Sequence, residues 1–363
     1  MSQRPDDEIN ARMYLPEEEL DGPDGDGELD LDAEASAARE ADHASFDDAL
    51  AAIEEGSIEL QTLTGLSDLS REQVEQLADI WRELAAEARA SIAEHAYVLG
   101  EDDLLHDYMR FFTYALDDES SAVRQFAARG HAAYDDAGLV EPLRRLATTD
   151  ISDDVRIAAV EALGSFADME EFGMLDAATG AEVTQALFAI VADAAATRLL
   201  RASALEAVAV ISGDERIQET IQRFFDADEV ELRLGAIRAM ARSVNPRWRP
   251  VLEATLRSPD PDARQEAVAA LGAYDDEALV PLLTLVARED REIDVRLEAV
   301  QTLGQIGGRT ALRELETLRE HASDDEIDAI DDAMAEAAQS IDPDEEPDDG
   351  DDDIDAELRR LGI

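Results

Sequence analysis

Five arginines stand close together between residues 232 and 252, a stretch of the chain that contains no acidic residue. They are Arg233, Arg238, Arg242, Arg247 and Arg249, and Trp248 lies between the last two. Guanidinium groups bind carboxylates and phosphates, and an exposed Trp stacks on a ring or a base. One interpretation is therefore a recognition patch for an acidic protein segment, a nucleotide or a nucleic acid. The other is that Arg233 and Trp248 are structural, while the remaining arginines pair with nearby acids.

Residue types that carry catalysis or bind metals are sparse and scattered. The chain has no Cys, which excludes disulfides, thiolate metal sites and a Cys nucleophile. Its His residues are not arranged as ligand pairs, although His95 and His106 flank a segment boundary and could meet in space. There is no Gly-rich phosphate loop and no Ser nucleophile motif. The sequence therefore predicts no catalytic residue, no metal site and no cofactor.

The charge balance is extreme. The chain has 88 acidic and 31 basic residues, all of the basic ones Arg, and a net charge of −57. Such a chain repels itself at low ionic strength, whereas about 1 M salt shortens the Debye length to roughly 3 Å. The composition resembles cytosolic proteins of salt-accumulating halophilic archaea. We expect a cytoplasmic protein, because no signal segment and no apolar run of about 20 residues is present. Nucleic acid and membrane are disfavoured as partners.

A ten-residue pattern recurs along the chain and must position these side chains. The segment 155–164 returns at 263–272 and 295–304, with looser copies at 123–132, 200–209 and 232–241. All six copies have Arg second and Ala fifth, and successive arginines are 32, 45, 32, 31 and 32 residues apart. A second apolar helical segment precedes each copy. This period predicts a stacked array of helical pairs.

Composition divides the chain into four parts. Residues 1–35 are predicted to be an acidic disordered tail, 36–101 a helical N-terminal cap module, 102–341 the repeat array, and 342–363 a second acidic tail. The 45-residue spacing indicates an insertion between Met169 and Gly180, on a surface of the array where insertions affect binding. Acids just before the pattern are expected to cap its helix. They are Asp154, Glu231, Asp262 and Asp294.

The pattern Arg-x-x-Ala-(Val/Ile/Leu)-x-x-(Leu/Met)-Gly, preceded by Asp and by a Pro-Leu-x-x-Leu helix, resembles HEAT repeats. It is most similar to the short subclass found in phycobilin lyases, and the resemblance covers residues 102–340. It implies an all-α fold, a right-handed α-solenoid of about seven helical hairpins with a helical N-terminal extension. A HEAT-like enzyme, deoxyhypusine hydroxylase, uses His-Glu dipeptides as iron ligands, and this chain has none.

The resemblance also implies that the second-position arginines form a structural ladder by pairing with loop acids of their own or the neighbouring repeat. We call these six residues the arginine ladder: Arg124, Arg156, Arg201, Arg233, Arg264 and Arg296. The alternative is a track of exposed arginines that binds anions. An Arg fork binds a carboxylate bidentately, which favours the structural interpretation.

Positions four and seven of the pattern are expected to face the inner curve of the array. The candidate partner-binding residues combine acids at these positions with the arginine-rich stretch: Glu161, Glu206, Glu266, Glu298, Arg238, Arg242, Arg247, Trp248 and Arg249. We expect a non-enzymatic scaffold that binds another protein on its concave face in a high-salt cytoplasm. The alternatives are a phycobilin-lyase-like enzyme acting on a cofactor-bearing protein, and a HEAT-like nucleic-acid binder. The oligomeric state stays open.

Overall fold

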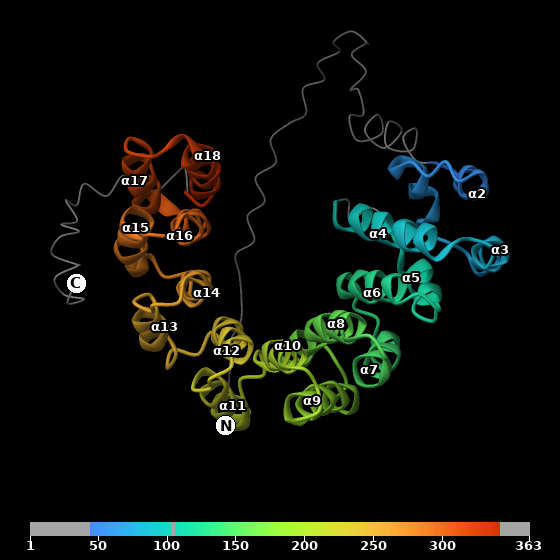
Figure 1. The fold of residues 1–363 in the computed structure, drawn as a ribbon, viewed down its shortest axis with the longest axis horizontal. Helices are drawn as coiled ribbons and strands as arrows, with labels where there is room; N and C mark the ends of the chain where they lie inside the picture. Colours follow the sequence, from blue (N-terminus) through green and yellow to red (C-terminus); the bar gives the residue numbers. More distant parts are fainter. Residues whose placement is uncertain (1–43, 103–105, 342–363) are drawn as a thin grey trace, which may run out of the picture. The chain divides into compact units, whose positions relative to one another are not determined.

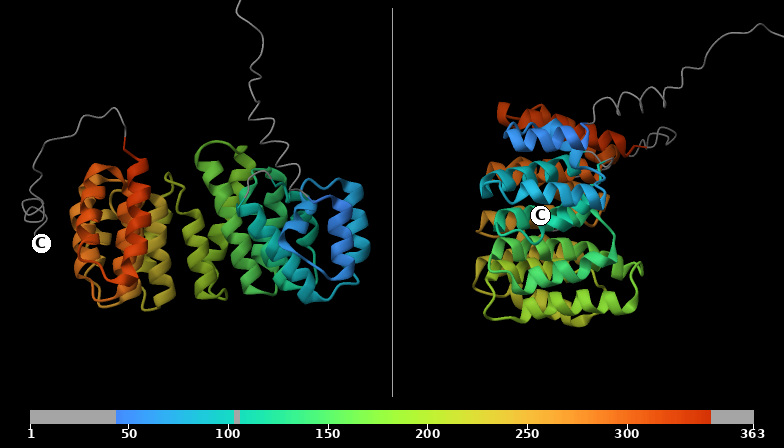
Figure 2. Two further views of the ribbon diagram at one scale, coloured as in Figure 1. Left: turned by 90° about the horizontal axis from the view of Figure 1, so that it is seen from above. Right: turned by 90° about the vertical axis from the view of Figure 1, so that its right-hand side faces the viewer.

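The computed structural model describes residues 44–102 and 106–341, and the two predicted acidic tails lie outside this part of the chain. All regular secondary structure in the described residues is helical (Figure 1). Seven helical pairs follow one another in chain order, and views from two further directions show their axes side by side (Figure 2). The predicted helical solenoid of about seven hairpins is confirmed.

In each pair the first helix lies in an outer row and the second in an inner row, on the concave side of the stack (Figure 1). The outer helices are α5 (Met109–Ala115), α7 (Val140–Thr149), α9 (Ala177–Ala192), α11 (Glu215–Phe225), α13 (Arg249–Thr255), α15 (Val280–Glu289) and α17 (Gly308–Arg319). The inner helices are α6 (Ser121–Gly130), α8 (Asp153–Glu171), α10 (Arg198–Val208), α12 (Val230–Ser243), α14 (Pro261–Gly272), α16 (Ile293–Ile306) and α18 (Asp324–Gln339). Short 3-10 turns η2 (His131–Ala133), η3 (Ala137–Leu139) and η4 (Glu277–Leu279) occur in the connections.

The recurring pattern forms the inner helices. Its small residues let neighbouring inner helices approach each other closely. The fifth-position alanines are all fully buried: Ala127, Ala159, Ala204, Ala236, Ala267 and Ala299. Gly235 shows how tight the contact is, since a Cβ atom there would lie 2.4 Å from the Cβ of Ala202. Each inner helix packs extensively against the next one, whereas neighbouring outer helices touch much less. The closer spacing of the inner row is what bends the stack.

The first residues of the inner helices contradict the prediction that the acids just before the pattern cap these helices. The inner helices α8, α12 and α16 begin after Ser152, Glu229 and Glu292, and none of these has a side-chain cap hydrogen bond. The acids predicted as caps are the second residues of these helices, where they lie in the first turn at the positive end of the helix dipole without capping it. Asp260 caps α14 by accepting a hydrogen bond from the backbone of Asp262.

The segment before the array forms α2 (Phe46–Glu55), η1 (Leu60–Leu66), α3 (Arg71–Trp81) and α4 (Ala86–Asp102). Ser45 and Ser70 begin α2 and α3 with complete capping boxes. Helix α4 packs on α6 in the way that inner helices pack on one another. Helix α4 therefore continues the inner row and covers the side of α6 that no preceding repeat covers. None of the described helices combines the length and the apolar content that a membrane span needs.

Candidate functional site

The arginine ladder joins successive repeats in part of the array. Arg264 is 4 % exposed, and its Nε and Nη2 donate to the two carboxylate oxygens of Asp290 at 2.8 Å each. Its Nη1 donates to the backbone oxygen of Ser258 at 3.0 Å. Asp290 lies in the turn of the next pair, and the hydrogen bonds from Arg264 are the main cause that lowers the pKa of its carboxyl. The guanidinium thus ties its own turn to the next repeat.

Two other ladder arginines do the same. Arg124 binds both oxygens of Asp150, at 2.7 and 2.9 Å, and Arg296 donates to Glu326 at 2.7 Å. The structure also adds a residue that the sequence pattern missed. Arg89, on α4, binds both oxygens of Asp118, at 2.9 and 3.1 Å. The contact pattern of the ladder therefore begins one helix before the predicted start of the array.

Of the remaining three ladder arginines, Arg233 pairs weakly with a loop acid of the next repeat, whereas Arg156 and Arg201 depart from that prediction. Arg233 approaches the carboxylate of Asp260 only to 3.9 Å and mainly binds the backbone oxygen of Ala227. Arg156 pairs with Asp153 in its own helix, at 3.3 Å. Arg201 donates to the backbone oxygen of Val191 and lies over the ring of Phe224, 5.2 Å from its centroid. The ladder arginines of α8 and α10, on either side of the insertion, thus make no ion pair with the next repeat.

The arginine-rich stretch is not one patch. Trp248 is only 2 % exposed, and its Nε1 donates to Gln218 at 2.6 Å, so its inclusion among partner-binding residues is wrong. Arg247 pairs with Glu215 at 2.9 Å, and Arg249 pairs with Glu253 and Asp276. These two arginines lie at the start of the outer helix α13. Arg238 and Arg242 lie on the inner helix α12, so helix geometry separates the four charges into two places.

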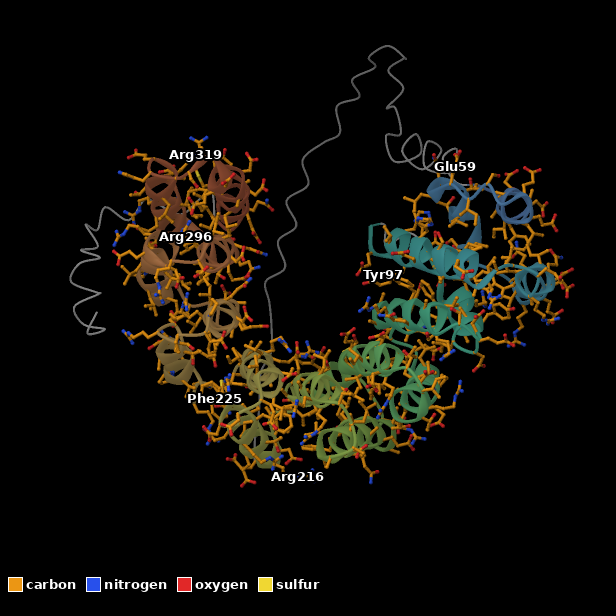
Figure 3. All side chains as sticks on the ribbon, viewed as in Figure 1. Glu59, Tyr97, Arg216, Phe225, Arg296 and Arg319 are labelled. Atoms are coloured by element: carbon orange, nitrogen blue, oxygen red, sulfur yellow. The ribbon has the colours of Figure 1, made fainter. Side chains whose placement is uncertain are left out.

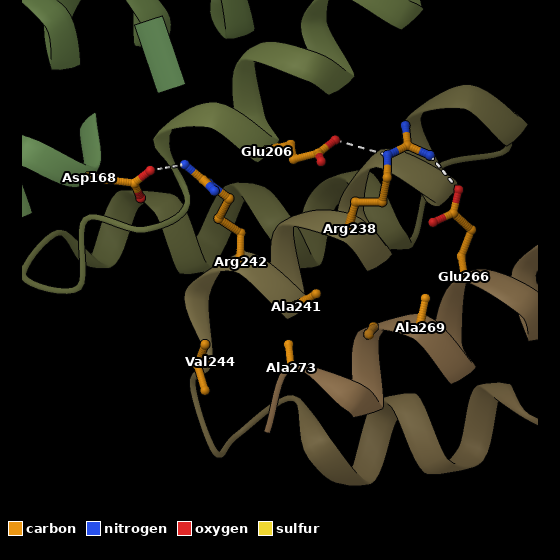
Figure 4. A pocket seen from close by; sticks show the side chains of 10 residues that line it. Asp168, Glu206, Arg238, Ala241, Arg242, Val244, Glu266, Ala269 and Ala273 are labelled. Carbon is orange, nitrogen blue, oxygen red and sulfur yellow. Dashed lines mark hydrogen bonds and ion pairs between the residues drawn. The ribbon is translucent and has the colours of Figure 1, made fainter. Parts of the chain in front are cut away.

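A groove on the inner row brings Arg238 and Arg242 together with acids from three other helices (Figure 4). Its volume is about 460 Å³. The lining residues come from α8, α10, α12, α14 and the ends of α12 and α14: Asp168, Glu206, Arg238, Ala241, Arg242, Val244, Glu266, Ala269, Ala270 and Ala273. Charged side chains form the wall, and alanines and Val244 form the floor and mouth. Two of the four predicted inner acids, Glu206 and Glu266, belong to this groove.

Ion pairs organise the wall of the groove. Arg238 donates from Nε to Glu206 at 2.9 Å and from Nη1 to Glu266 at 2.6 Å. Arg242 pairs with Asp168 and donates to the backbone oxygen of Gly164 at 3.2 Å. Burial raises the pKa of the Glu266 carboxyl, Arg238 opposes this shift, and nearby Glu206 and Glu298 add to it. The groove can therefore hold a charged ligand in a partly desolvated setting.

The other two predicted inner acids continue the same face. Glu161 on α8 lies 3.7 Å from Arg129 on α6, and Glu298 on α16 accepts a hydrogen bond from Gln265 at 3.2 Å. Burial raises the pKa of Glu161, Arg129 lowers it, and Glu206 raises it further. Tyr97 lies on the inner side of α4 (Figure 3), and its hydroxyl donates to Glu101 at 2.6 Å.

Two other surfaces stand out from the acidic background. A second groove of about 490 Å³ lies between α11, α12, α13 and α14, with Phe225, Ile237 and Val251 in its lining. The predicted insertion extends α8 to Glu171 and forms a turn in which Phe172 is 74 % exposed and Met174 is 62 % exposed. These apolar side chains mark the insertion as an exposed edge of the array.

In the described residues, no group of three His, Asp or Glu side chains is placed to hold a metal ion. His131 is fully buried against Phe112 and Tyr134, and neither ring nitrogen has a hydrogen-bond partner. Burial lowers the pKa of its imidazole to about 4, against a small opposite effect of Asp136. His131 is therefore a neutral core residue.

Comparison with known protein families identifies the class of protein. The HEAT-repeat family model matches residues 109–209, 217–294 and 250–341, which is more than half of the chain. The chain therefore belongs to the HEAT-repeat family. No curated protein matches it in sequence.

Several solved structures are similar to this chain at low sequence identity. The Escherichia coli protein YibA is 18% identical over 77% of this chain and 96% of that chain, with a TM-score of 0.39. Human deoxyhypusine hydroxylase, solved with glycerol, is 17% identical over 79% and 98%, with a TM-score of 0.33. The CpcE–CpcF complex of phycocyanin lyase from Nostoc sp. PCC 7120 is 16% identical over 63% and 94%, with a TM-score of 0.41.

Proposed function

We propose that this chain is a non-enzymatic HEAT-repeat scaffold that holds a segment of another protein against its inner row of helices. The observation that carries the proposal is the inner groove, in which three consecutive inner helices present Glu206, Arg238 and Glu266 in fixed ion pairs above a floor of alanines. Such a surface offers shape and charge for recognition along several repeats. The proposal includes a cytoplasm of high ionic strength, supported by the net charge of −57.

Charge and pairing in the groove favour this function over the two alternatives. Asp168, Glu206 and Glu266 are each paired with Arg238 or Arg242, which suits recognition better than a free general acid. The three carboxylates also outnumber the two guanidiniums, and a surplus of carboxylates repels a phosphate backbone. The lyase-like and nucleic-acid-binding functions stay predictions from the sequence.

The test is site-specific photocrosslinking with the full chain in an extract of its own cells at high salt. The crosslinking residue p-benzoylphenylalanine replaces Ala269, which is exposed in the groove, or Glu182, which is exposed on the outer helix α9. We expect a crosslinked polypeptide from position 269 and none from position 182. Equal products from both positions, or none from position 269, would contradict the proposal.

A further inference from the structure

Six consecutive inner helices, α6 to α16, each contribute one charged side chain to the same face. We call these residues the inner column: Arg129, Glu161, Glu206, Arg238, Glu266 and Glu298. Read in order, they give one arginine and two glutamates, and then the same again. Adjacent members interact, as the ion pairs of both arginines show. The column is an unpartnered helix face whose charges follow a regular order.

Arg238 shows how a guanidinium fits between two glutamates of this column. It stands on α12 and donates to Glu206 on α10 and to Glu266 on α14, so one planar fork bridges both neighbouring helices. Its side chain is 29 % exposed, which places the charge at the surface of the groove. The inner column thus already contains one arginine that is bound between two glutamates.

Two junctions of the column have glutamates on both sides. Glu161 and Glu206 stand on the packed helices α8 and α10, and Glu266 and Glu298 stand on the packed helices α14 and α16. The repulsion between the members of each pair contributes to the raised pKa values of Glu161 and Glu266. No ion pair of the described residues places an arginine between the two members of either pair. Each junction therefore has two glutamates, as the site around Arg238 does, but has no arginine between them.

We propose that these two junctions receive arginine side chains of the partner segment, one between Glu161 and Glu206 and one between Glu266 and Glu298. The inference rests on the proposed function and specifies the chemistry of the partner. The two incoming guanidiniums would give the column alternating charge from α6 to α16. Arginine suits the site better than lysine, because its planar fork can bind two carboxylates at once.

The order of helices sets the spacing of the two arginines. Three inner-helix steps separate the junctions, and at about 8–10 Å a step they are roughly 25–30 Å apart. An extended segment covers this distance with about eight or nine residues at roughly 3.3 Å each. Side chains of an extended segment alternate between its two faces, so the two arginines must be an even number of positions apart, and eight positions match the column.

The experiment measures binding of a labelled peptide to the full chain by fluorescence anisotropy in 1 M KCl, where long-range attraction to the acidic surface is screened. The probe has two arginines eight positions apart in a Gly/Ser sequence, and a second peptide has lysines in their place. We expect the arginine peptide to bind more tightly. The substitutions Glu161→Gln and Glu206→Gln together should raise its Kd by about tenfold or more, the effect of losing charge-assisted hydrogen bonds.

The matched control removes the same charge from the outer row. Glu182→Gln and Glu219→Gln change two exposed glutamates of α9 and α11, and the Kd should stay unchanged.

A second measurement uses the chain without substitutions. Carbon-13 NMR should show that the peptide lowers the pKa of the Glu161 carboxyl, because a cation stabilises the carboxylate. An unchanged Kd in the inner variant, an equal loss in the outer variant, or no response of Glu161 would overturn the inference. If position 269 still crosslinks to a partner, only the partner's chemistry is wrong, and the scaffold function stands.

Discussion

Arg264 and Asp290 lie 26 positions apart in the chain and meet through two parallel hydrogen bonds of 2.8 Å. Their side chains are only 5 % and 11 % exposed, and Arg264 also binds the end of its own outer-helix turn at Ser258. One guanidinium thus connects three segments of backbone. The bidentate pair recurs at Arg124 and Arg89, whereas the contact that all six ladder arginines share is the hydrogen bond to a backbone oxygen near the end of their own outer helix.

Removing Arg264 should cost much more stability than removing an exposed arginine. Arg264→Gln leaves the Asp290 carboxylate nearly buried without its cation, and we expect a loss of about 3 kcal/mol in the free energy of unfolding. Arg144→Gln breaks an exposed pair with Glu141 and should cost less than about 1 kcal/mol. Urea unfolding followed by circular dichroism measures both, and equal losses would contradict the structural role of the ladder.

The arginine that the sequence pattern missed should matter more than one that it included. Arg89→Gln removes two hydrogen bonds to the nearly buried Asp118, which also accepts from Trp81, and should cost about 3 kcal/mol. Arg201→Gln removes one backbone hydrogen bond and a stacking contact, and should cost about 1 kcal/mol. Thermal unfolding of the two variants compares them, and the reverse order would refute this assignment.

The buried His131 should make the protein sensitive to mild acid. Its pKa falls from 6.5 in the unfolded chain to about 4 in the folded protein, so the unfolded state binds the proton more readily. Stability is therefore full above pH 6.5 and decreases as the pH falls toward 4, by about 3 kcal/mol in total.

His131→Phe retains an aromatic ring and has no titrating group. The difference in unfolding free energy between wild type and this variant should change between pH 6.5 and 4 and level off below. A difference that is constant over this range would show that His131 is charged or solvated in the folded protein.

Salt should stabilise the fold. With a net charge of −57, raising KCl from 0.1 to 1 M shortens the Debye length from about 10 Å to about 3 Å and screens the repulsion among carboxylates. The unfolding temperature should rise steeply over this range, as differential scanning calorimetry can measure. The same concentrations of sucrose separate screening from general exclusion effects. A falling unfolding temperature would contradict the expectation that the fold depends on high ionic strength.

Much of the fold follows from local sequence, because Arg and Ala recur at a fixed period and the buried alanines dictate close helix packing. The missed Arg89 lies in a helix where Ile92 replaces the fifth-position Ala, so the pattern does not identify it. Trp248 lies between two arginines and so suggested an exposed ring. Its burial depends on Gln218, 30 residues away, which accepts its N–H.

Only part of the candidate site follows from the sequence. Helical spacing predicts that Glu206, Arg238 and Glu266 lie on the inner face, and they do. Their mutual pairing depends on the register between neighbouring helices, which close contacts such as Gly235 against Ala202 determine. The partner of Arg242 is Asp168, two inner helices away on the extended part of α8. A repeat pattern describes one repeat at a time and does not contain this contact.

The distribution of arginine bridges has a mechanical consequence. At the ladder position, bridges to the next repeat occur at Arg89, Arg124, Arg264 and Arg296 and more weakly at Arg233, while Arg156 and Arg201 make none. Other ion pairs couple this middle section, because Arg238 on α12 binds Glu206 on α10 and Arg242 on α12 binds Asp168 on α8. The middle of the array is therefore held together by the same ion pairs that line the groove, so a ligand that displaced one of them would also loosen the contact between neighbouring inner helices.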